Sequence, residues 1–204
     1  MSSKEKILAN IRQAKGSNNL WKGVEEPLQD DFFQQKDESL LETFRQSFEA
    51  IDGKFYLVSS DDELQKILKL VFSKEDVFCV DNVLQEKLKF VSIHYQSDIK
   101  AKKVNYGFIR CEYITARLGS VITSALSGSG RRLNVFPENQ VVLVEKEQLV
   151  ADTKDALLAL QKKYDTLPSM ISLATGPSRT ADIEKTLILG AHGPKTLTVI
   201  YKNY

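Results

Sequence analysis

The feature that most constrains the fold is an alternation, from residue 54 onward, of short apolar runs and segments with helical periodicity. Runs such as 55–58 and 77–80 have the length and the continuous hydrophobicity of strands that are buried on both faces. Between them, apolar residues recur at helical spacing from 64 to 71, behind a capping box at 60–63. Because right-handed crossovers place helices on both faces of a parallel sheet, this pattern predicts a three-layer α/β/α fold with a mostly parallel sheet.

The alternation continues to the end of the chain with one interruption. We predict a helix at 82–89, a strand at 91–95, a long helix at 147–164, a strand at 169–174, a short helix near 181–187 and a closing strand at 196–201. The stretch from 104 to 145 lacks a helical period and is punctuated by glycines. We expect its extended segments, 104–109, 120–126 and 140–144, to be strands joined by hairpins, with 127–130 as an open loop.

The first 53 residues are predicted to form a helical extension in front of the α/β domain at 54–204. A short apolar stripe at 7–11 indicates one helix. A second helix, at 34–52, carries apolar residues on one face and ends at Gly53, a residue suited to a helix stop. We expect these helices to pack on a neighbouring protein or to cover the edge of the sheet.

Charge and composition exclude several functional classes. The 204 residues include 28 basic and 27 acidic side chains, so no global attraction to nucleic acid is predicted. No uncharged apolar run reaches the roughly 18 residues of a membrane span, and the start lacks a signal-peptide core, which predicts a cytoplasmic protein. Cys79 and Cys111 are too few for a disulfide framework or an all-thiolate cluster, and the two histidines are isolated. We therefore expect this chain to hold no metal or cofactor.

The strongest local motif is a strand followed by a Gly-Pro turn and the expected start of a helix, at 173–184. Such a strand end is where open α/β sheets bind ligands, and a helix N-terminus offers backbone N–H groups to an anion. The candidate ligand-binding residues are Thr175, Gly176, Pro177, Ser178, Arg179, Thr180, Asp182 and Glu184. Arg179 could add a bidentate contact to a phosphate or carboxylate. The alternative is a capped helix in which Arg179 pairs with an acidic side chain of the first turn.

Two further glycine-containing segments supply weaker candidates. His192 and Gly193 lie in the small-residue loop 189–194, where His192 could act as an acid or base or could simply fix the turn through a backbone carbonyl. Arg117 and Gly119 lie in a segment where the backbone could approach an anion closely. The alternative for these is an ordinary hairpin turn with a solvated arginine. No residue is assigned a catalytic role.

Residues 175–184 and 187–194, together with Arg132-Leu133 and the apolar run 141–144, resemble the lactate-utilization protein C family, whose members carry the LUD domain. The resemblance implies a fold like the sugar-phosphate isomerases and coenzyme A transferases. It also implies a role in oxidising L-lactate to pyruvate with two iron–sulfur partner proteins. Because this chain lacks the cysteines for clusters, the iron–sulfur clusters are expected in those partner subunits.

One segment departs from the family pattern. Many relatives read Ala-Glu-Thr-Gly-Thr where residues 116–120 of this chain read Ala-Arg-Leu-Gly-Ser. A carboxylate nucleophile of the coenzyme A transferase kind is therefore missing at that position. The replacement favours anion binding by Arg117 over a covalent acyl mechanism.

These observations favour a non-redox subunit of a lactate-oxidising system that binds a small carboxylate or phosphate at 175–180, with His192 nearby. Two alternatives belong to other classes. One is a stand-alone enzyme acting on a sugar phosphate or an acyl-coenzyme A, which rests on fold analogy alone. The other is a pure scaffold whose strand-end loops dock the partner subunits.

Overall fold

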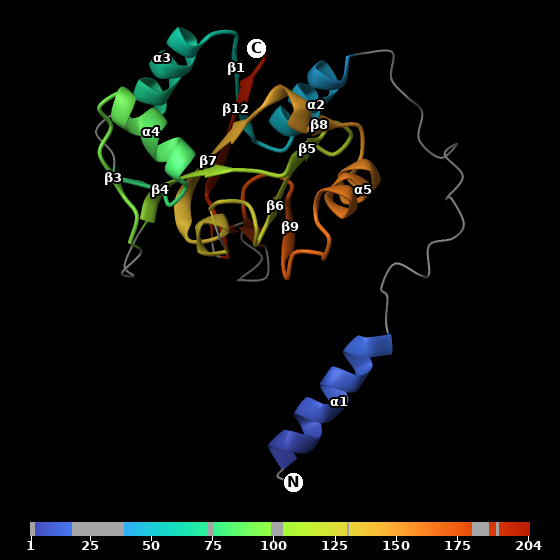
Figure 1. Cartoon of the computed structure of the whole chain (residues 1–204). Helices are drawn as coiled ribbons and strands as arrows, with labels where there is room; N and C mark the ends of the chain where they lie inside the picture. Colours follow the sequence, from blue (N-terminus) through green and yellow to red (C-terminus); the bar gives the residue numbers. More distant parts are fainter. Residues whose placement is uncertain are drawn as a thin grey trace. The chain divides into compact units, whose positions relative to one another are not determined.

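The computed structural model describes residues 3–17, 39–72, 76–98, 104–129, 131–180, 188–190 and 192–204. The chain divides into two compact units, Met1–Asp37 and Glu38–Tyr204. The first unit contains helix α1 (Ser3–Ser17), which includes the apolar stripe predicted at 7–11 to be helical (Figure 1). The fold described below is that of the second unit.

A six-stranded parallel sheet forms the centre of this unit within the described residues, in the order β1-β12-β7-β4-β2-β3 (Figure 1). Its strands are β1 (Lys54–Val58), β2 (Val77–Phe78), β3 (Tyr95–Gln96), β4 (Val104–Arg110), β7 (Pro137–Val144) and β12 (Thr196–Lys202). Val142 of β7 lies opposite both Ile109 and Val199, so the apolar runs of three strands stack in register. The predicted α/β class with a mostly parallel sheet is confirmed.

Helices α3 (Asp61–Val71) and α4 (Asn82–Phe90) cover one face of the sheet. The hydroxyl of Ser60 caps α3 by accepting a hydrogen bond from the Glu63 N–H, as the sequence predicts. The Glu63 carboxylate, however, accepts its backbone bond from Ser59 rather than from Ser60. The buried side chains between helices and sheet are Leu64, Leu68, Leu84, Leu88, Phe108 and Val141.

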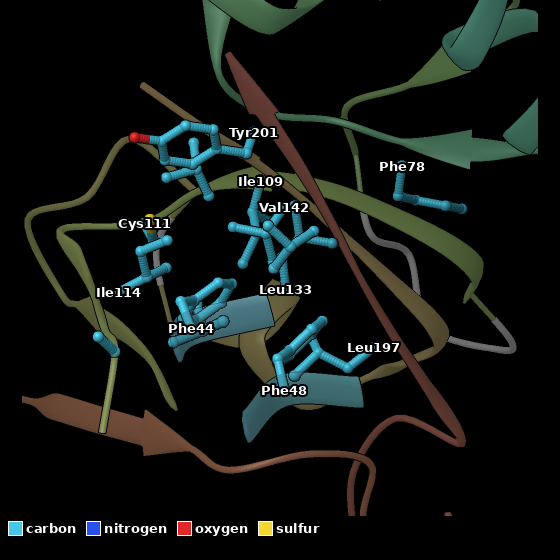
Figure 2. Close-up of a cluster of buried hydrophobic side chains, with 14 of the residues drawn as sticks. Phe44, Phe48, Phe78, Ile109, Cys111, Ile114, Leu133, Val142, Leu197 and Tyr201 are labelled. Atoms are coloured by element: carbon cyan, nitrogen blue, oxygen red, sulfur yellow. The ribbon is translucent and has the colours of Figure 1, made fainter. Parts of the chain in front are cut away.

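Helix α2 (Leu40–Glu49) covers the other face. Its Phe44 and Phe48 rings stack with centroids 5.2 Å apart and are fully buried. They pack against Ile109, Val142 and neighbouring side chains in the core that Figure 2 shows. The compact unit therefore begins before the predicted boundary at 53/54, and α2 belongs to it.

A smaller four-stranded sheet adjoins α2 on this side. Its strands are β8 (Leu149–Val150), β5 (Tyr113–Thr115), β6 (Ser120–Ser124) and β9 (Ile171–Ala174), in that order. Helix α5 (Thr153–Lys163) packs Ala156 and Leu160 against Ile122 of this sheet. Short 3-10 turns η2 (Arg132–Asn134) and η3 (Lys146–Gln148) and the ribbon β10 (Arg179–Thr180) with β11 (Ile188–Leu189) complete the described elements.

Several predicted elements in the middle of the chain were wrong in type or connection. The hairpins expected between 104–109, 120–126 and 140–144 are not formed: β4 and β7 are parallel neighbours in the central sheet, and β6 forms its hairpin with β5, a strand that was not predicted. The segment 127–129 is not an open loop, since Ser127 and Ser129 are buried. The strand expected at 169–174 is present as β9, but it lies in the smaller sheet and pairs antiparallel with β6.

Helix and strand ends also differ from prediction for local reasons. The helix expected at 147–164 begins only at Thr153, because the Asp152 side chain caps it there. The strand expected at 91–95 is reduced to β3, since Ser92 has a positive φ of 59° just after α4. The helix expected at 34–52 spans Leu40–Glu49 within the described residues, and the helix expected near 181–187 lies outside them. Among the described helices, none combines the length and hydrophobicity needed to cross a membrane.

Candidate functional site

The predicted ligand-binding loops lie against each other in the structure. The Ser178 N–H donates to the Pro194 carbonyl over 2.8 Å, and the Gly190 N–H donates to the Ser178 carbonyl over 2.9 Å. Ser120 and Thr175 share a hydrogen bond of 2.8 Å between their hydroxyls, which joins the loops to the segment containing Gly119. The structure thus brings together Thr175, Ser178 and Gly193 with the segment that contains Gly119, whereas the Arg117 side chain is directed to Asp152. His192 is exposed in the same loop, and Asp182 and Glu184 lie outside the described residues.

Both candidate arginines of this region form ion pairs with carboxylate side chains of the protein. Arg179 donates to the Asp52 carboxylate and, over 2.9 Å, to the Ile51 carbonyl just after α2. It does so from strand β10, and the helix expected to follow near 181–187 lies outside the described residues. Arg117 donates to Asp152, the cap of α5, over 2.5 and 3.0 Å.

The two glycines of this region allow α2 to approach closely. Gly119 and Gly176 have φ angles of 61° and 82°. A Cβ at Gly119 would lie 2.6 Å from the Phe48 backbone nitrogen, and one at Gly176 would lie 2.7 Å from the Ile51 carbonyl oxygen. These close approaches show that the loops pack against the C-terminal end of α2. Anion binding by the loops stays a prediction.

A separate pocket of about 170 Å³ lies at the carboxyl ends of β4 and β7. Ligands of parallel α/β sheets bind at this end of the strands. Three cationic side chains, Lys87, Arg110 and Lys163, line the pocket together with two acidic ones, Glu112 and Glu145. The lining therefore combines charged side chains of both signs with an apolar wall.

Glu112 is the most buried ionisable group of the pocket, with a side chain 1% exposed. It accepts hydrogen bonds from the Ser124 hydroxyl at 2.5 Å, the Lys163 ammonium at 2.7 Å and the Tyr164 hydroxyl at 3.0 Å. Burial alone would raise the pKa of Glu112, but these three donors together outweigh it and hold the pKa below its usual value. Glu112 is therefore ionised at neutral pH.

Asp81 and Arg110 form the second ion pair at the pocket in which the carboxylate is buried. One oxygen of Asp81 caps α4 by accepting from the Val83 and Leu84 N–H groups at 2.9 and 3.3 Å. The other oxygen accepts from Arg110 Nε at 2.7 Å and from Nη2 at 2.6 Å. Gly128 lies directly over this pair, and a Cβ there would collide with the Asp81 carboxylate. Because only glycine fits at position 128, the loop 126–128 can lie directly against the Asp81–Arg110 pair at the pocket.

The LUD domain family model matches residues 41–201. The chain belongs to the LUD domain family. It is 28% identical over 171 residues to Lactate utilization protein C of Anoxybacillus flavithermus, covering 83% of this chain and 72% of that protein. It is 26% identical over 182 residues to Lactate utilization protein C of Oceanobacillus iheyensis, covering 86% and 75%. The resemblance predicted from the C-terminal motifs is confirmed.

Among solved structures, a DUF162 family protein from Deinococcus radiodurans has a similar fold. The TM-score is 0.59 at 16% sequence identity, and the similarity covers 80% of this chain and 96% of that one. At this identity the likeness concerns the fold alone. The family match begins inside α2, in agreement with the packing of Phe44 and Phe48 into the core of this LUD domain protein.

Sequence reasoning missed the pocket residues of this LUD domain. One signal was available, because Arg110 and Glu112 are charged residues within the otherwise apolar run 108–114. A charge in such a run is expected to be paired. Their partners could not be read from the sequence, since Asp81 lies 29 residues from Arg110, and Lys163 lies 51 residues from Glu112.

The two cysteines are buried in different cores, Cys79 with α3 and α4 and Cys111 with α2. Burial raises the pKa of each thiol to about 12. Within the described residues, no three or more His, Cys, Asp or Glu side chains are grouped so that they could hold a metal ion.

Proposed function

We propose that this protein acts in lactate utilization. The observation that carries the proposal is the LUD domain match over residues 41–201, together with relatives named Lactate utilization protein C that align with more than four-fifths of the chain. The alignment also spans more than two-thirds of those relatives, so it includes most of their sequence and not one shared segment.

Its proposed role is that of a non-redox subunit that binds a small anionic ligand. The pocket at the carboxyl ends of β4 and β7 supports this role, because Arg110 and Lys163 are fixed there by buried carboxylates. The loops are less favourable, because the carboxylates that pair with Arg179 and Arg117 are not buried: the side chains of Asp52 and Asp152 are 79% and 25% exposed.

The oxidation itself is assigned to iron–sulfur partner proteins. Support comes from the cysteine content of this chain, which has two thiols placed in two separate cores. The electrons removed from lactate would pass to clusters in the partners, while this subunit would hold the anion or organise the assembly.

Deletion of the gene in its own organism tests the role. We expect loss of growth on L-lactate as carbon source, normal growth on glucose, and rescue by the wild-type gene. The complemented strain should carry a tagged chain whose co-purified proteins are assayed for iron and acid-labile sulfide. Unimpaired growth of the deletion strain on lactate would refute the role, and a tagged chain that co-purifies no iron–sulfur protein would refute the partners.

A further inference from the structure

The two ion pairs at the pocket share an unusual distribution of exposure. Their carboxylates are buried, with side chains of Asp81 and Glu112 only 2% and 1% exposed. Their cations are open to the pocket, with side chains of Arg110 and Lys163 41% and 48% exposed. The pair Lys202–Glu145 at the same end of the sheet has the opposite arrangement, with the cation 13% and the carboxylate 40% exposed. The first two pairs therefore hold cations in fixed positions at a surface that a ligand can reach.

Both cations keep hydrogen-bond donors beyond those used on their partners. A guanidinium carries five N–H groups, and Asp81 takes bonds from Nε and Nη2 of Arg110. The donors that remain match the planar fork of a carboxylate. Lys163 has three N–H groups and directs one to Glu112.

Tyr164 adds a group of a different kind. Its hydroxyl donates to Glu112 and also interacts with the Lys163 ammonium, which leaves one lone pair of the oxygen for a ligand. A ligand hydroxyl can therefore donate to Tyr164, and a ligand keto oxygen can accept from Lys163. The two residues are adjacent in the sequence, and the Lys163 ammonium lies 5.3 Å from the centre of the Tyr164 ring.

The size and the apolar wall of the pocket limit the ligand to a few heavy atoms. Its volume of about 170 Å³ is well below the roughly 300–1,000 Å³ of pockets that enclose drug-sized ligands. Leu126 and Leu143 line it, so a methyl group attached to the polar part of the ligand would be buried against them. The pocket cannot enclose a whole nucleotide or acyl-coenzyme A.

We propose that this pocket binds a small 2-hydroxy- or 2-oxocarboxylate, with Arg110 on the carboxylate and Lys163 and Tyr164 on the oxygen at carbon 2. Asp81 and Glu112 are positioning residues that hold the two cations. The inference rests on the proposed function and gives its ligand a chemical class and a location.

Calorimetric titration of the full chain with L-lactate, pyruvate, propionate and inorganic phosphate tests the chemical class. Lactate or pyruvate should bind at least tenfold more tightly than propionate, which lacks the oxygen at carbon 2, since a hydrogen bond to a charged group is worth about this factor or more. Phosphate should bind more weakly than either. Equal affinity for lactate, pyruvate and propionate, tighter binding of phosphate, or no binding at all would overturn the proposal.

Conservative variants test the location. Arg110→Lys keeps a cation beside Asp81 but removes the fork, and we expect at least a tenfold loss of affinity for lactate and pyruvate. Tyr164→Phe leaves Glu112 bonded to Ser124 and Lys163, and should reduce the preference for lactate over propionate. Arg45→Lys and Tyr56→Phe are the matched controls outside the pocket, and circular dichroism verifies folding. If Arg179→Lys weakens binding and Arg110→Lys does not, the ligand lies in the loops instead.

The binding result and the growth result separate the two proposals. Loss of growth on lactate in the deletion strain without binding in vitro would leave the proposed function standing and remove the pocket assignment. Binding with the predicted selectivity alongside normal growth would support the pocket and refute the role in lactate utilization.

Discussion

Glu112 couples the stability of the domain to pH. Because its pKa is lowered in the folded state, the stabilisation it provides is complete above the ordinary glutamate pKa and is lost as the pH falls through the lower folded-state value. Glu112→Gln removes the charge and leaves Lys163 and Tyr164 with a poorer acceptor. We expect a loss of about 2–4 kcal/mol in the free energy of unfolding at pH 7, measured by urea titration.

The pH dependence of this loss distinguishes it from a packing defect. The difference between wild type and Glu112→Gln should shrink as the pH falls below about 4.3, where the unfolded glutamate takes up its proton. Glu86→Gln is the matched control, since Glu86 pairs with Lys89 on the exposed face of α4 and such pairs contribute about 0–1 kcal/mol. A difference that stays constant between pH 7 and pH 3.5 would contradict the assignment.

The two thiols should be unreactive in the folded protein. The nucleophile is the thiolate, and burial raises the pKa of Cys79 and Cys111 to about 12. We expect labelling by a thiol reagent at pH 7.5 to be slow in native protein and rapid for both residues after addition of denaturant. Rapid native labelling of one thiol would show that its segment opens locally.

At the residue scale, two charged side chains within an apolar run were a signal for ion pairing that the prediction overlooked, and the sequence does not show their partners. A charge within an apolar run had to be paired, and Arg110 and Glu112 are paired. Arg179 was expected to meet an anion or a carboxylate of its own segment, and it meets Asp52, 127 residues away. Pairing over such distances depends on the sheet order, which residue spacing does not encode.

At the scale of elements, Gly119 is the position on which the docking of α2 depends. Its φ of 61° disfavours any side chain, and a Cβ would lie 2.6 Å from the backbone nitrogen of Phe48. We expect Gly119→Ala to cost about 2–4 kcal/mol of stability, from backbone strain together with overpacking. The midpoint of urea unfolding measures this cost.

Leu118→Ala serves as the neighbouring control, because Leu118 is 38% exposed and its truncation creates no collision. We expect it to change stability by less than about 1 kcal/mol. Equal effects of the two substitutions would mean that α2 is not held by this close approach.

The prediction of elements from sequence succeeded where hydrophobic periodicity was strong and failed where strands were short. The helices at 61–71 and 82–90 and the central strands other than β3 were recognisable from their own residues. Strand β8 has two residues and exists only because β5 lies beside it. Helix α5 begins later than predicted, because Asp152 is its N-cap. Several polar residues between 145 and 155 could have served as the cap, so the sequence did not single out Asp152.

For the whole molecule, the central sheet has two apolar faces, and both must be covered. One face is covered by α3 and α4, and the other by α2 together with the smaller sheet. This requirement follows from the continuous hydrophobicity of the central strands, which the sequence displayed. The sequence did not show that the layer on the second face begins with α2 at Leu40, which lies within the predicted N-terminal extension.

Two truncations test where the domain begins. A chain of residues 38–204 retains both cores and should unfold cooperatively, with a melting temperature within a few degrees of the full chain. A chain of residues 54–204 lacks Phe44 and Phe48, each worth about 3–5 kcal/mol when truncated in a core, and exposes the sheet face around Val142. We expect it to aggregate or to lose cooperative unfolding, as measured by calorimetry and light scattering. Equal stability of the two chains would instead place the domain boundary at residue 54, because α2 would then contribute nothing to the fold.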